Sequence, residues 1–530
     1  MLDQLVKDKF GELKSVLVQA LGQDAVTDDL AKRELMSQDI WAKGTTAELI
    51  VAPRSLDQLV DTVKAATERG IPINPRGAGM SYTKGYAPDR EGVMMLDMSK
   101  MNRVIEVNAD DMYVTVEAGC TWNDLHNAVS AKGLRVPFWG PLSGLTSTIG
   151  GGLSQNNAFF GAGKYGTTGD SVLSVTVVLA DGTLVKTGTA GTRNAKPFWR
   201  HYGPDLTGIF CGDAGTMGLK AEITLRLIPA PKTEAWASYE FSSHDAWAKA
   251  MSALMREDLA TEIFGFDPNL TRVRMARASM MSDAKALTNV MKKQGNLLKA
   301  LTEGAKVAMA GRGFMADASY TMHYTVEGRS QAGVKEEIGI LNKICESFGG
   351  KAIENSIPKI IRANPFGPLN SIIGPSGERW VPIHGIVPVS EGAACVAEIN
   401  AAFESMSAEF DKHNILTGYL LTSLGTTGFL IEPVFIWPEE LYDIHRETVE
   451  PGVLSKIKTF EPNAAATEIV MQGRQRVLDV FKSHGAAHFQ IGRTYPYFEN
   501  REDGALDLLK RIKSAVDEHY SINPGSAGLG

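Results

Sequence analysis

The sequence predicts an α+β protein with more than one domain, and three observations support this. The chain has 530 residues, more than one hydrophobic core usually serves. From about Ile50, short runs rich in β-branched residues alternate with amphipathic helical patterns. Two prolines, Pro229 and Pro231, mark a change in composition. We therefore expect a first domain over residues 1–234, a second over 235–463 and a tail over 464–530.

The first domain begins with an amphipathic pattern over residues 1–21 that carries charges throughout. It fits neither a secretory signal nor a membrane span, so we expect a cytoplasmic protein. Residues 47–53 predict a strand, 54–70 an amphipathic helix, and 71–77 a strand that enters a glycine turn. Residues 93–119 are strand-rich and 121–133 predict a helix. Residues 171–188 predict a hairpin that turns at Asp181 and Gly182.

The second domain is predicted to mix strands and helices. Residues 234–243 predict a strand and 244–258 a helix, and later strands are expected in "WVPIHGIVPVS" and "TGFLIEPVFIW". A methionine-bearing helical stretch runs from Met275 to Met315. It carries Lys292, Lys293 and Lys299, so it fits an amphipathic helix of this domain or a contact with a membrane surface. The tail predicts a helix from Ala464, a strand over 486–498 and another helix.

Composition narrows the classes of function. The chain has 44% hydrophobic and 22% charged residues, and its net charge of −7 comes without a basic stripe, so nucleic acid is not expected as a main partner. The four cysteines form no CxxC pair. This argues against a zinc ribbon or a disulfide scaffold and favours reduced, buried thiols.

Three glycine-rich stretches are the candidates for ligand binding. "NPRGAGMSYTKG" (74–85) follows a predicted strand, where bare backbone N–H groups can approach an anion, although an ordinary tight turn would look the same. "TSTIGGGLSQNN" (146–157) holds three consecutive glycines, and "GDAGTMG" (212–218) precedes a strand. The spacing matches neither GxGxxG nor a P-loop. Two long glycine-rich loops in one domain instead suggest one extended ligand.

The order of these motifs resembles a known family. "PRGAGMS", "VTVEAG", "TIGGGLSQNN…KYGTTGDSVLSVTVVLADG" and "GDAGTMGLKAEITLRL" are similar to the FAD-binding domain of the vanillyl alcohol oxidase and p-cresol methylhydroxylase flavoproteins. That family also contains glycolate oxidase subunits, D-lactate dehydrogenases and alkyl-dihydroxyacetonephosphate synthase. The resemblance covers about residues 30–230, and "INPGSAGLG" is similar to the family's C-terminal ending. It implies an α+β protein with a two-part FAD-binding domain, N-terminal and C-terminal, around an α+β substrate-binding cap.

The resemblance also implies which residues contact FAD. The first loop supplies Pro75, Arg76, Gly77, Ala78, Gly79, Met80, Ser81 and Tyr82. The second supplies Pro141, Ser147, Thr148, Gly151, Gly152, Ser154, Asn156, Gly161, Tyr165 and Gly166. The third supplies Gly212, Gly215, Thr216, Gly218, Leu219 and Ile223.

Covalent attachment of the flavin is not expected. Relatives that tether FAD through a histidine of the first loop have it where this chain has Met80, and a thioether cannot form that bond. Other relatives use a cap residue, and Trp437, Tyr442 and His445 lie in the corresponding region. We expect non-covalent FAD.

Candidate catalytic residues follow from the same resemblance. Arg493 is expected beside the flavin N1 and C2 carbonyl, where a cation stabilises the charge of the reduced ring, although a surface arginine is the alternative. Tyr495, with Tyr497, and Tyr165 are candidates to hold a phenolate, or else pack as ordinary aromatics. His384 is a candidate base or a buried structural histidine.

No metal is expected. The histidine patterns "HGDGNxH" and "EHGIG", which hold a metal in the hydroxy-acid relatives, do not occur in this chain. His484 and His488 lie four residues apart and would suit a metal only on a helix, whereas His488 is predicted to enter a strand.

These observations predict an FAD-dependent oxidoreductase. We expect it to take hydride from a CH–OH or benzylic carbon of a small aromatic or phenolic substrate, and to pass electrons to oxygen or a carrier protein. One alternative is a 2-hydroxy-acid dehydrogenase. Thr167 favours it because phenol-oxidising relatives often have an aspartate there, whereas the lack of the metal motif counts against it. Another is a non-redox flavoprotein like the ether-lipid synthase. Homodimers are common among the relatives, and a homodimer is expected here.

Overall fold

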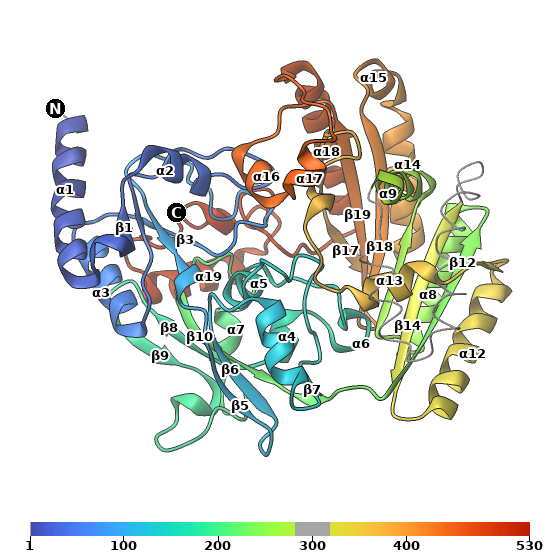
Figure 1. The fold of residues 1–530 in the computed structure, drawn as a ribbon, viewed down its shortest axis with the longest axis horizontal. Coiled ribbons are helices and arrows are strands. Elements are labelled where there is room, and N and C mark those ends of the chain that lie inside the picture. The colour runs from blue at the N-terminus through green and yellow to red at the C-terminus, as the bar shows by residue number, and fades with distance from the viewer. Residues whose placement is uncertain (1, 281–318) are drawn as a thin grey trace.

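The computed structural model describes residues 2–280 and 319–530, and it has two parts that lie side by side (Figure 1). One part contains the strands of the first 230 residues, and the other is built on a large antiparallel sheet. The prediction of an α+β fold with a cap is confirmed. The boundary at residue 234 remains our proposal.

The N-terminal part contains a four-stranded sheet in the order β1-β2-β4-β3, in which β2, β4 and β3 run parallel. Its helix α3 begins after Ser55, whose hydroxyl accepts the N–H of Gln58, and it buries Leu59, Val63 and Ala66 at helical spacing. The elements are α1 (Leu2–Leu21), β1 (Val26–Thr27), α2 (Leu30–Met36), β2 (Leu49–Val51), α3 (Leu56–Thr67), β3 (Ile73–Arg76) and β4 (Met94–Asp97).

A five-stranded antiparallel sheet follows in the order β5-β6-β10-β8-β9. The predicted hairpin is confirmed: β8 pairs with β9, and Gly182 takes the positive φ of 81° that its turn requires. The elements are β5 (Val104–Asn108), β6 (Tyr113–Glu117), α4 (Trp122–Ser130), β7 (Leu134–Arg135), α5 (Ile149–Gln155), α6 (Ala162–Tyr165), β8 (Val172–Val178), β9 (Leu184–Lys186), α7 (Leu206–Ile209), β10 (Leu219–Arg226) and β11 (Ile228–Pro229).

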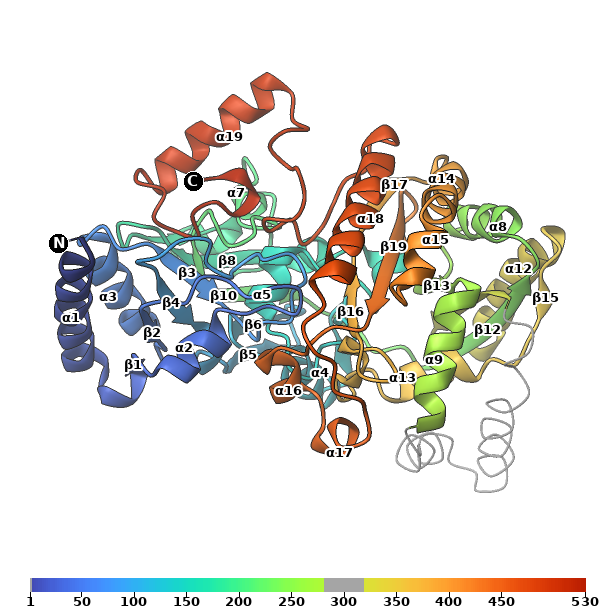
Figure 2. The same cartoon turned by 90° about the horizontal axis from the view of Figure 1, so that it is seen from above.

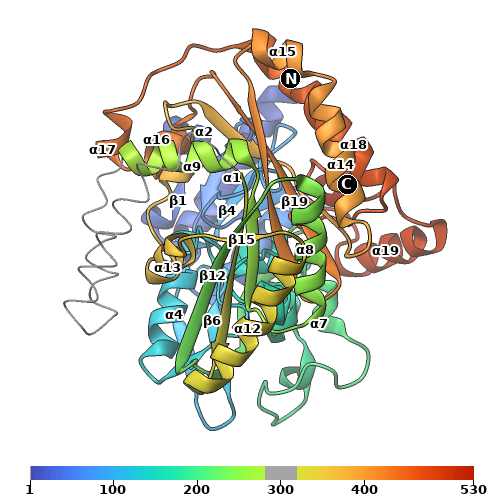
Figure 3. The same ribbon diagram turned by 90° about the vertical axis from the view of Figure 1, so that its right-hand side faces the viewer.

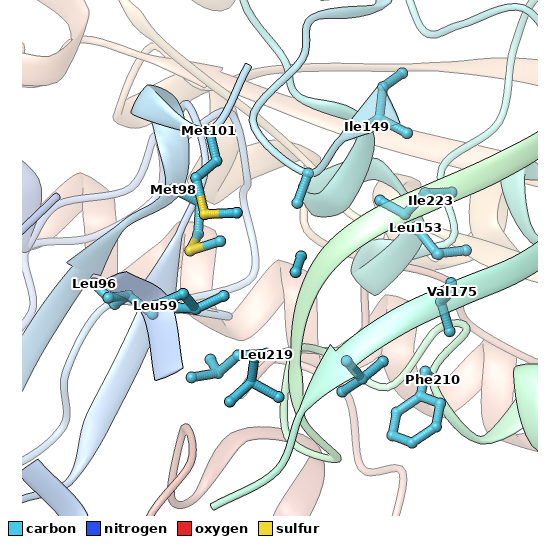
Figure 4. Packing of buried hydrophobic residues seen from close by; sticks show 14 of the residues in the cluster. Leu59, Leu96, Met98, Met101, Ile149, Leu153, Val175, Phe210, Leu219 and Ile223 are labelled. Carbon is cyan, nitrogen blue, oxygen red and sulfur yellow. The ribbon is translucent and has the colours of Figure 1, made fainter. Parts of the chain in front are cut away.

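The two sheets share one core with α5. Figure 4 shows Leu59 of α3 and Leu96 of the first sheet on the side of Leu219 of the second sheet, with Ile223 of the second sheet beside Leu153 of α5. These side chains are almost fully buried. The packing fixes the ends of β3, α5 and β10, from which the glycine-rich stretches extend.

The second part is an eight-stranded sheet in the order β15-β12-β14-β13-β18-β19-β16, with β17 also paired to β19. Helices α8, α12, α14 and α18 lie on one side of this sheet, and α9 and α13 on the other (Figure 3). The strands are β12 (Thr233–Phe241), β13 (Glu262–Phe266), β14 (Tyr320–Gly328), β15 (Lys351–Ala352), β16 (Arg379–Pro382), β17 (Gly385–Pro388), β18 (Leu416–Leu424) and β19 (Gly428–Trp437). The helices are α8 (His244–Arg256), α9 (Pro268–Met280), α12 (Gln331–Ser347), α13 (Ser356–Ala363), α14 (Gly392–Glu404), α15 (Ser407–Lys412), α16 (Asp443–Thr448), α17 (Pro451–Leu454) and α18 (Ala464–Ser483).

The tail differs from its prediction. Helix α18 packs against α14 and β19 of the cap, so the return to the FAD-binding part comes after it. The strand predicted over residues 486–498 is wrong: this described segment forms turns and only one isolated bridge, from Ala487 to Ile386. Gln490 and Gly492 have φ of 54°, which breaks an extended run.

Beyond the turns, helix α19 (Asp503–Val516) anchors the C-terminal segment to the N-terminal part (Figure 2). Lys513 is fully buried and donates to Thr216 O at 2.7 Å and to Asp517 at 2.6 Å. Asn523 donates from its side chain to Gly85 O and Ala214 O, both at 2.7 Å. These bonds hold the first and third glycine-rich stretches together.

The stretch suggested for membrane contact extends beyond the described residues, and Lys292, Lys293 and Lys299 all lie outside them. Among the helices that are described, none has an apolar run long enough to span a bilayer.

Candidate active site

A cavity of about 250 Å³ lies between the glycine-rich stretches and the cap. Its floor comes from the segments that follow β3, surround α5 and precede β10. Its opposite wall comes from α9, β16, β18 and β19. The sequence-predicted residues that line it are Pro75, Arg76, Gly77, Ala78, Gly79, Met80, Ser81, Tyr82, Pro141, Ser147, Thr148, Gly151, Gly152, Ser154, Gly215, Gly218, Leu219 and His384.

The first loop needs its glycines because other groups approach it closely. A Cβ on Gly77 would lie 2.4 Å from Thr148 Oγ1, the N-cap of α5. Gly79 has a φ of 80°, and its carbonyl accepts the Tyr86 hydroxyl at 2.9 Å. Met80 is half-buried and packs against a small apolar cluster that includes Leu369 and Ile372 of the cap. Met80 therefore puts an apolar side chain at the position where some relatives have a tethering histidine.

The second stretch forms the short helix α5. Thr148 accepts the Gly151 N–H at 3.2 Å, and a Cβ on Gly150 would lie 2.7 Å from Ala118 Cβ. A Cβ on Gly152 would lie 2.9 Å from the Asn157 amide. The three glycines therefore let α5 pack against β6 and its own loop while one face of its backbone lines the cavity.

The residues present fit a long, polar cofactor. Backbone from all three stretches lines one continuous cavity. Within the glycine-rich stretches, the lining side chains of Arg76 and Gln155 each have a buried polar atom (Nε and Oε1) without a hydrogen-bond partner among the described residues. A phosphate-bearing ligand with a polar ring system would supply such partners.

Substitution of Gly79 by alanine should weaken FAD binding by at least about tenfold. Its Cβ would lie 2.4 Å from Arg76 Nη2 and 2.8 Å from the Tyr86 hydroxyl, so the Arg76 guanidinium would have to leave its place in the cavity. Gly92→Ala is the matched control, because Gly92 also has a positive φ, of 72°, but no atom lies within 4 Å of its Cβ position. Fluorescence titration of apoprotein with FAD measures both. Equal losses in the two variants would contradict a cradle role for Gly79.

Other residues predicted to contact FAD lie away from the cavity. They hold turns or fill the core: Asn156, Gly161, Tyr165, Gly166, Gly212, Thr216 and Ile223. Asn156, for example, ends α5 with a φ of 50° and accepts the Gly169 N–H through its side chain. Ile223 points into the core shown in Figure 4. Their positions give these residues a supporting role in the glycine-rich loops.

Arg493 holds two segments of the chain together and does not line the cavity. Its guanidinium donates to the carbonyls of Lys84 at 2.7 Å and Pro524 at 2.6 Å, and it lies 3.4 Å from Asp89. It is absent from the cavity lining. Arg493 therefore clamps the C-terminal segment onto the first loop, and its position gives no support to a role beside the flavin ring.

Tyr165 lies near a cluster of four buried charges, away from the cavity. The cluster consists of Arg135 on β7, Glu262 on β13, Glu327 on β14 and Arg362 on α13. Burial raises the pKa of Tyr165, and Arg135 partly offsets this. Glu262 also accepts the Gly161 N–H at 2.6 Å. The cluster therefore links the loop that follows the second glycine-rich stretch to the cap.

The cap wall of the cavity follows from strand register. Leu420 on β18 is opposite Glu432 on β19, and Thr422 is opposite Leu430. Because side chains alternate along a strand, these four residues share one face of the sheet, and all of them line the cavity. On these two strands the lining is apolar apart from Thr422 and Glu432. A single carboxylate in the run "GFLIEPVFIW" was the sequence signal that pointed to Glu432, and our sequence analysis missed it.

Arg274 brings a cation to the same cavity. It lies four residues after Leu270 on α9, so both face the cavity from one side of the helix. Asp267 holds the start of α9 by accepting the N–H groups of Leu270 at 2.9 Å and Tyr419 at 3.1 Å. The guanidinium carbon lies 4.1 Å from the Phe266 ring centroid.

The Arg274 guanidinium has spare capacity to bind an anion. Its Nε is shielded from solvent, and no described residue accepts a hydrogen bond from it. Burial lowers its pKa to about 10, partly offset by Glu432, so it stays charged at neutral pH. No motif marks this residue in the sequence.

His384 lies between β16 and β17 and is 3% exposed. Its Nε2 is 3.3 Å from Glu432 Oε2, and its Nδ1 is 3.0 Å from the Tyr495 hydroxyl. Tyr495 lies behind His384 and does not line the cavity. His384 and Tyr495, which sequence analysis selected separately, are thus brought together, with Glu432 on the cavity side.

No group of three histidine, cysteine or acidic residues that would hold a metal ion occurs within residues 2–280 and 319–530. His484 ends α18 and contacts Glu391 at 3.0 Å and Glu398 at 3.2 Å, whereas His488 donates to the His384 carbonyl at 2.7 Å. The tether candidates Trp437, Tyr442 and His445 do not line the cavity.

This site combines bare backbone for an extended cofactor with a cap that offers a cation and a carboxylate to a small substrate, as expected of a two-part cofactor-dependent enzyme. Residues 47–188 match the family described as the FAD binding domain. The fold is similar to that of p-cresol methylhydroxylase, whose structure was solved with substrate bound. The TM-score is 0.75 and the identity 18%, and the match covers 98% of this chain and 97% of that one. Alkyldihydroxyacetonephosphate synthase shares this fold with a TM-score of 0.70, 16% identity and coverage of 97% and 85%.

The relatives found by sequence comparison have a higher identity to this chain than these two structures. Glycolate oxidase subunit GlcD of Bacillus subtilis is 30% identical over 280 residues, which are 52% of this chain and 58% of that protein. The mitochondrial D-lactate dehydrogenase [cytochrome] of Arabidopsis thaliana is 30% identical over 54% of this chain and 48% of its own length. A probable mitochondrial D-lactate dehydrogenase of Danio rerio is 32% identical over 511 residues, 95% of this chain and 89% of that protein.

The chain therefore belongs to the family of FAD-linked oxidoreductases that contains these D-lactate dehydrogenases and the glycolate oxidase subunit. Its match spans about half the length of the glycolate oxidase subunit and of the Arabidopsis enzyme. The sequence-based family resemblance and the FAD cofactor are confirmed.

Proposed function

We propose that the protein is an FAD-dependent dehydrogenase of a small 2-hydroxy acid. The observation that carries this proposal is the Arg274 guanidinium, which lines the cavity and whose buried Nε has no hydrogen-bond partner among the described residues. A carboxylate is the natural partner of such a group, because charge-assisted bonds between guanidinium and carboxylate are frequently bidentate. The names of the sequence relatives, glycolate oxidase subunit and D-lactate dehydrogenase, also favour a hydroxy acid.

The phenolic substrate favoured by the sequence analysis has less support. Neither of its candidate tyrosines, Tyr495 and Tyr165, lines the cavity. The likeness to p-cresol methylhydroxylase concerns the fold alone. The 2-hydroxy acid, considered first as an alternative, accounts for both Arg274 and Glu432.

FAD, when bound, supplies the acceptor for the hydride that leaves the substrate carbon. The chain's own residues hold the substrate. Arg274 binds the carboxylate, and the pair of Glu432 and His384 is placed to accept the hydroxyl proton. The apolar side chains of Leu420 and Leu430 exclude water from this side of the cavity. For the electrons that leave the enzyme we propose a carrier protein, since one relative is named as a cytochrome-linked dehydrogenase.

Anaerobic mixing with a panel of donors tests the proposal. We expect 2-hydroxy acids to bleach the flavin absorbance band, and the corresponding primary alcohols and hydroxy amides, which lack the carboxylate, to bleach it far more slowly. Bleaching by phenols and not by any hydroxy acid would restore the phenolic alternative. If no donor bleaches the flavin band, the alternative of a non-redox flavoprotein would be favoured instead.

We also propose that FAD is held without a covalent bond. Met80 occupies the tethering position of the first loop, and the cap candidates Trp437, Tyr442 and His445 lie away from the cavity. After acid precipitation of the holoenzyme, the yellow colour should stay in the supernatant. Colour in the protein pellet would show a covalent link.

A further inference from the structure

The hydrogen bonds around His384 determine which of its ring nitrogens carries a proton. The backbone N–H of His384 donates to the Tyr495 hydroxyl oxygen at 2.6 Å. The same oxygen lies 3.0 Å from His384 Nδ1. Tyr495 is buried, and burial raises the pKa of its hydroxyl well above the usual value, so the hydroxyl keeps its proton. One hydroxyl thus contacts both the backbone and the ring of His384.

The Tyr495 hydroxyl has one proton to donate, and His384 Nδ1 is the acceptor within reach. If Nδ1 carried a proton instead, the buried hydroxyl proton would have no acceptor among the described residues. An unsatisfied buried donor costs about 1–3 kcal/mol. Tyr495 therefore donates to Nδ1, and the neutral ring of His384 carries its proton on Nε2.

His384 Nε2 lies on the side of Glu432, whose Oε2 is 3.3 Å away. His384 therefore presents a donor on the cavity side, with no lone pair free to accept the substrate's proton. Glu432 faces the cavity with a side chain that is 15% exposed. A carboxylate oxygen has lone pairs that can accept the substrate's hydroxyl proton.

We propose that Glu432 is the group that accepts the substrate's hydroxyl proton, and that Tyr495 acts as a positioning residue by fixing the tautomer of His384. The proposal rests on the proposed function for the identity of the substrate. The C2–H bond breaks and its hydride, with two electrons, passes to bound FAD, while the O–H bond breaks, the proton passes to a Glu432 oxygen and the C–O bond becomes a carbonyl. The product is a 2-oxo acid.

Neighbouring groups fit this assignment. Arg274 is the other charged side chain of the cap wall and holds the substrate's carboxylate near Glu432. Arg474 of α18 donates to Pro382 O at 3.0 Å and so braces the strand end before His384. His488 stacks on the Tyr495 ring, with centroids 4.2 Å apart, and donates to His384 O at 2.7 Å. The histidine is thus fixed through both its ring and its backbone.

The tautomer is testable without turnover. Nitrogen-15 spectra of the holoenzyme labelled at its 10 histidines, with His384 assigned by loss of its signal in His384→Gln, should show a neutral ring protonated on Nε2. Tyr495→Phe should move the proton toward Nδ1, whereas Tyr497→Phe, two residues away, should leave the pattern unchanged. A ring protonated on Nδ1 in the wild-type enzyme would overturn the role of Tyr495.

The role of Glu432 is tested by anaerobic reduction of the flavin with a 2-hydroxy acid. Glu432→Gln should slow reduction by about 10²- to 10⁴-fold, the range of general-base contributions, while the substrate's Kd changes little. Glu432→Asp should recover part of the rate, and Tyr495→Phe should shift the pH profile of reduction. A Glu432→Gln rate within threefold of wild type would overturn the assignment. Failure of wild type to be reduced by any 2-hydroxy acid would reject the proposed function, and with it the step assigned to Glu432, whereas the nitrogen-15 result would still decide the tautomer.

Discussion

Substitution of Arg274 by methionine is expected to lower kcat/KM for a 2-hydroxy acid by about 10²- to 10³-fold. Removing a charge-assisted, bidentate partner in a shielded site costs about 3–4 kcal/mol. Methionine keeps an unbranched apolar stem of similar length, so the cavity wall should persist. Steady-state kinetics with an artificial electron acceptor measure the change.

Arg272→Met provides the matched control. Arg272 is on the same helix but is exposed, and it donates to Asn269 at 2.7 Å. We expect its kcat/KM to stay within about twofold of wild type, because the residue does not line the cavity. An Arg274→Met enzyme that matches this control on hydroxy acids would contradict carboxylate binding by Arg274. Oxidation of neutral alcohols should differ little between the two variants.

Substitution of Arg362 by methionine is expected to lower the free energy of unfolding by about 3–5 kcal/mol. Arg362 pairs with Glu262 at 3.2 Å and also with Glu327, in a cluster that includes Arg135 and is almost fully buried. Burial would raise the pKa of Glu327, but Arg362 and Arg135 outweigh it and lower the pKa to about 2. Loss of Arg362 leaves two buried carboxylates with one arginine. Denaturant unfolding of the holoenzyme measures the loss.

The exposed pair of Arg511 and Asp507 on α19 is the control for this prediction. Its side chains are 70% and 65% exposed, so Arg511→Met should change stability little. The Arg362 variant should also weaken the link from Gly161 to the cap, because Glu262 accepts the Gly161 N–H. Equal stability of the two variants would show that the cluster contributes nothing.

The glycine-rich loops could be predicted from sequence because their requirement is local. Close approach and positive φ restrict the residue type at Gly77 and Gly79, and the pattern is legible along the chain. The hairpin at Gly182 was predictable for the same reason. The contacts of Arg493 could not be predicted in this way. Its guanidinium donates to backbone carbonyls of Lys84 and Pro524, and these partners have no signal in the sequence around Arg493.

The cap wall could not be assembled from sequence. Arg274 and Glu432 are far apart in the chain, and they meet in one cavity because α9 packs on β18 and the register places Leu420 opposite Glu432. Neither contact has a local signature. The strand predicted over 486–498 failed because alternating aromatics there pack around turns: Tyr495 reaches back to His384, and Gly492 has a positive φ.

The central claim is that this cavity oxidises a 2-hydroxy acid by hydride transfer to FAD. Anaerobic stopped-flow mixing of the holoenzyme with a 2-hydroxy acid, protonated or deuterated at C2, tests it most directly. We predict that the flavin band bleaches in a single turnover and that deuterium slows the bleaching several-fold, because the C2–H bond breaks in that step. A flavin that stays oxidised with every 2-hydroxy acid would contradict the claim.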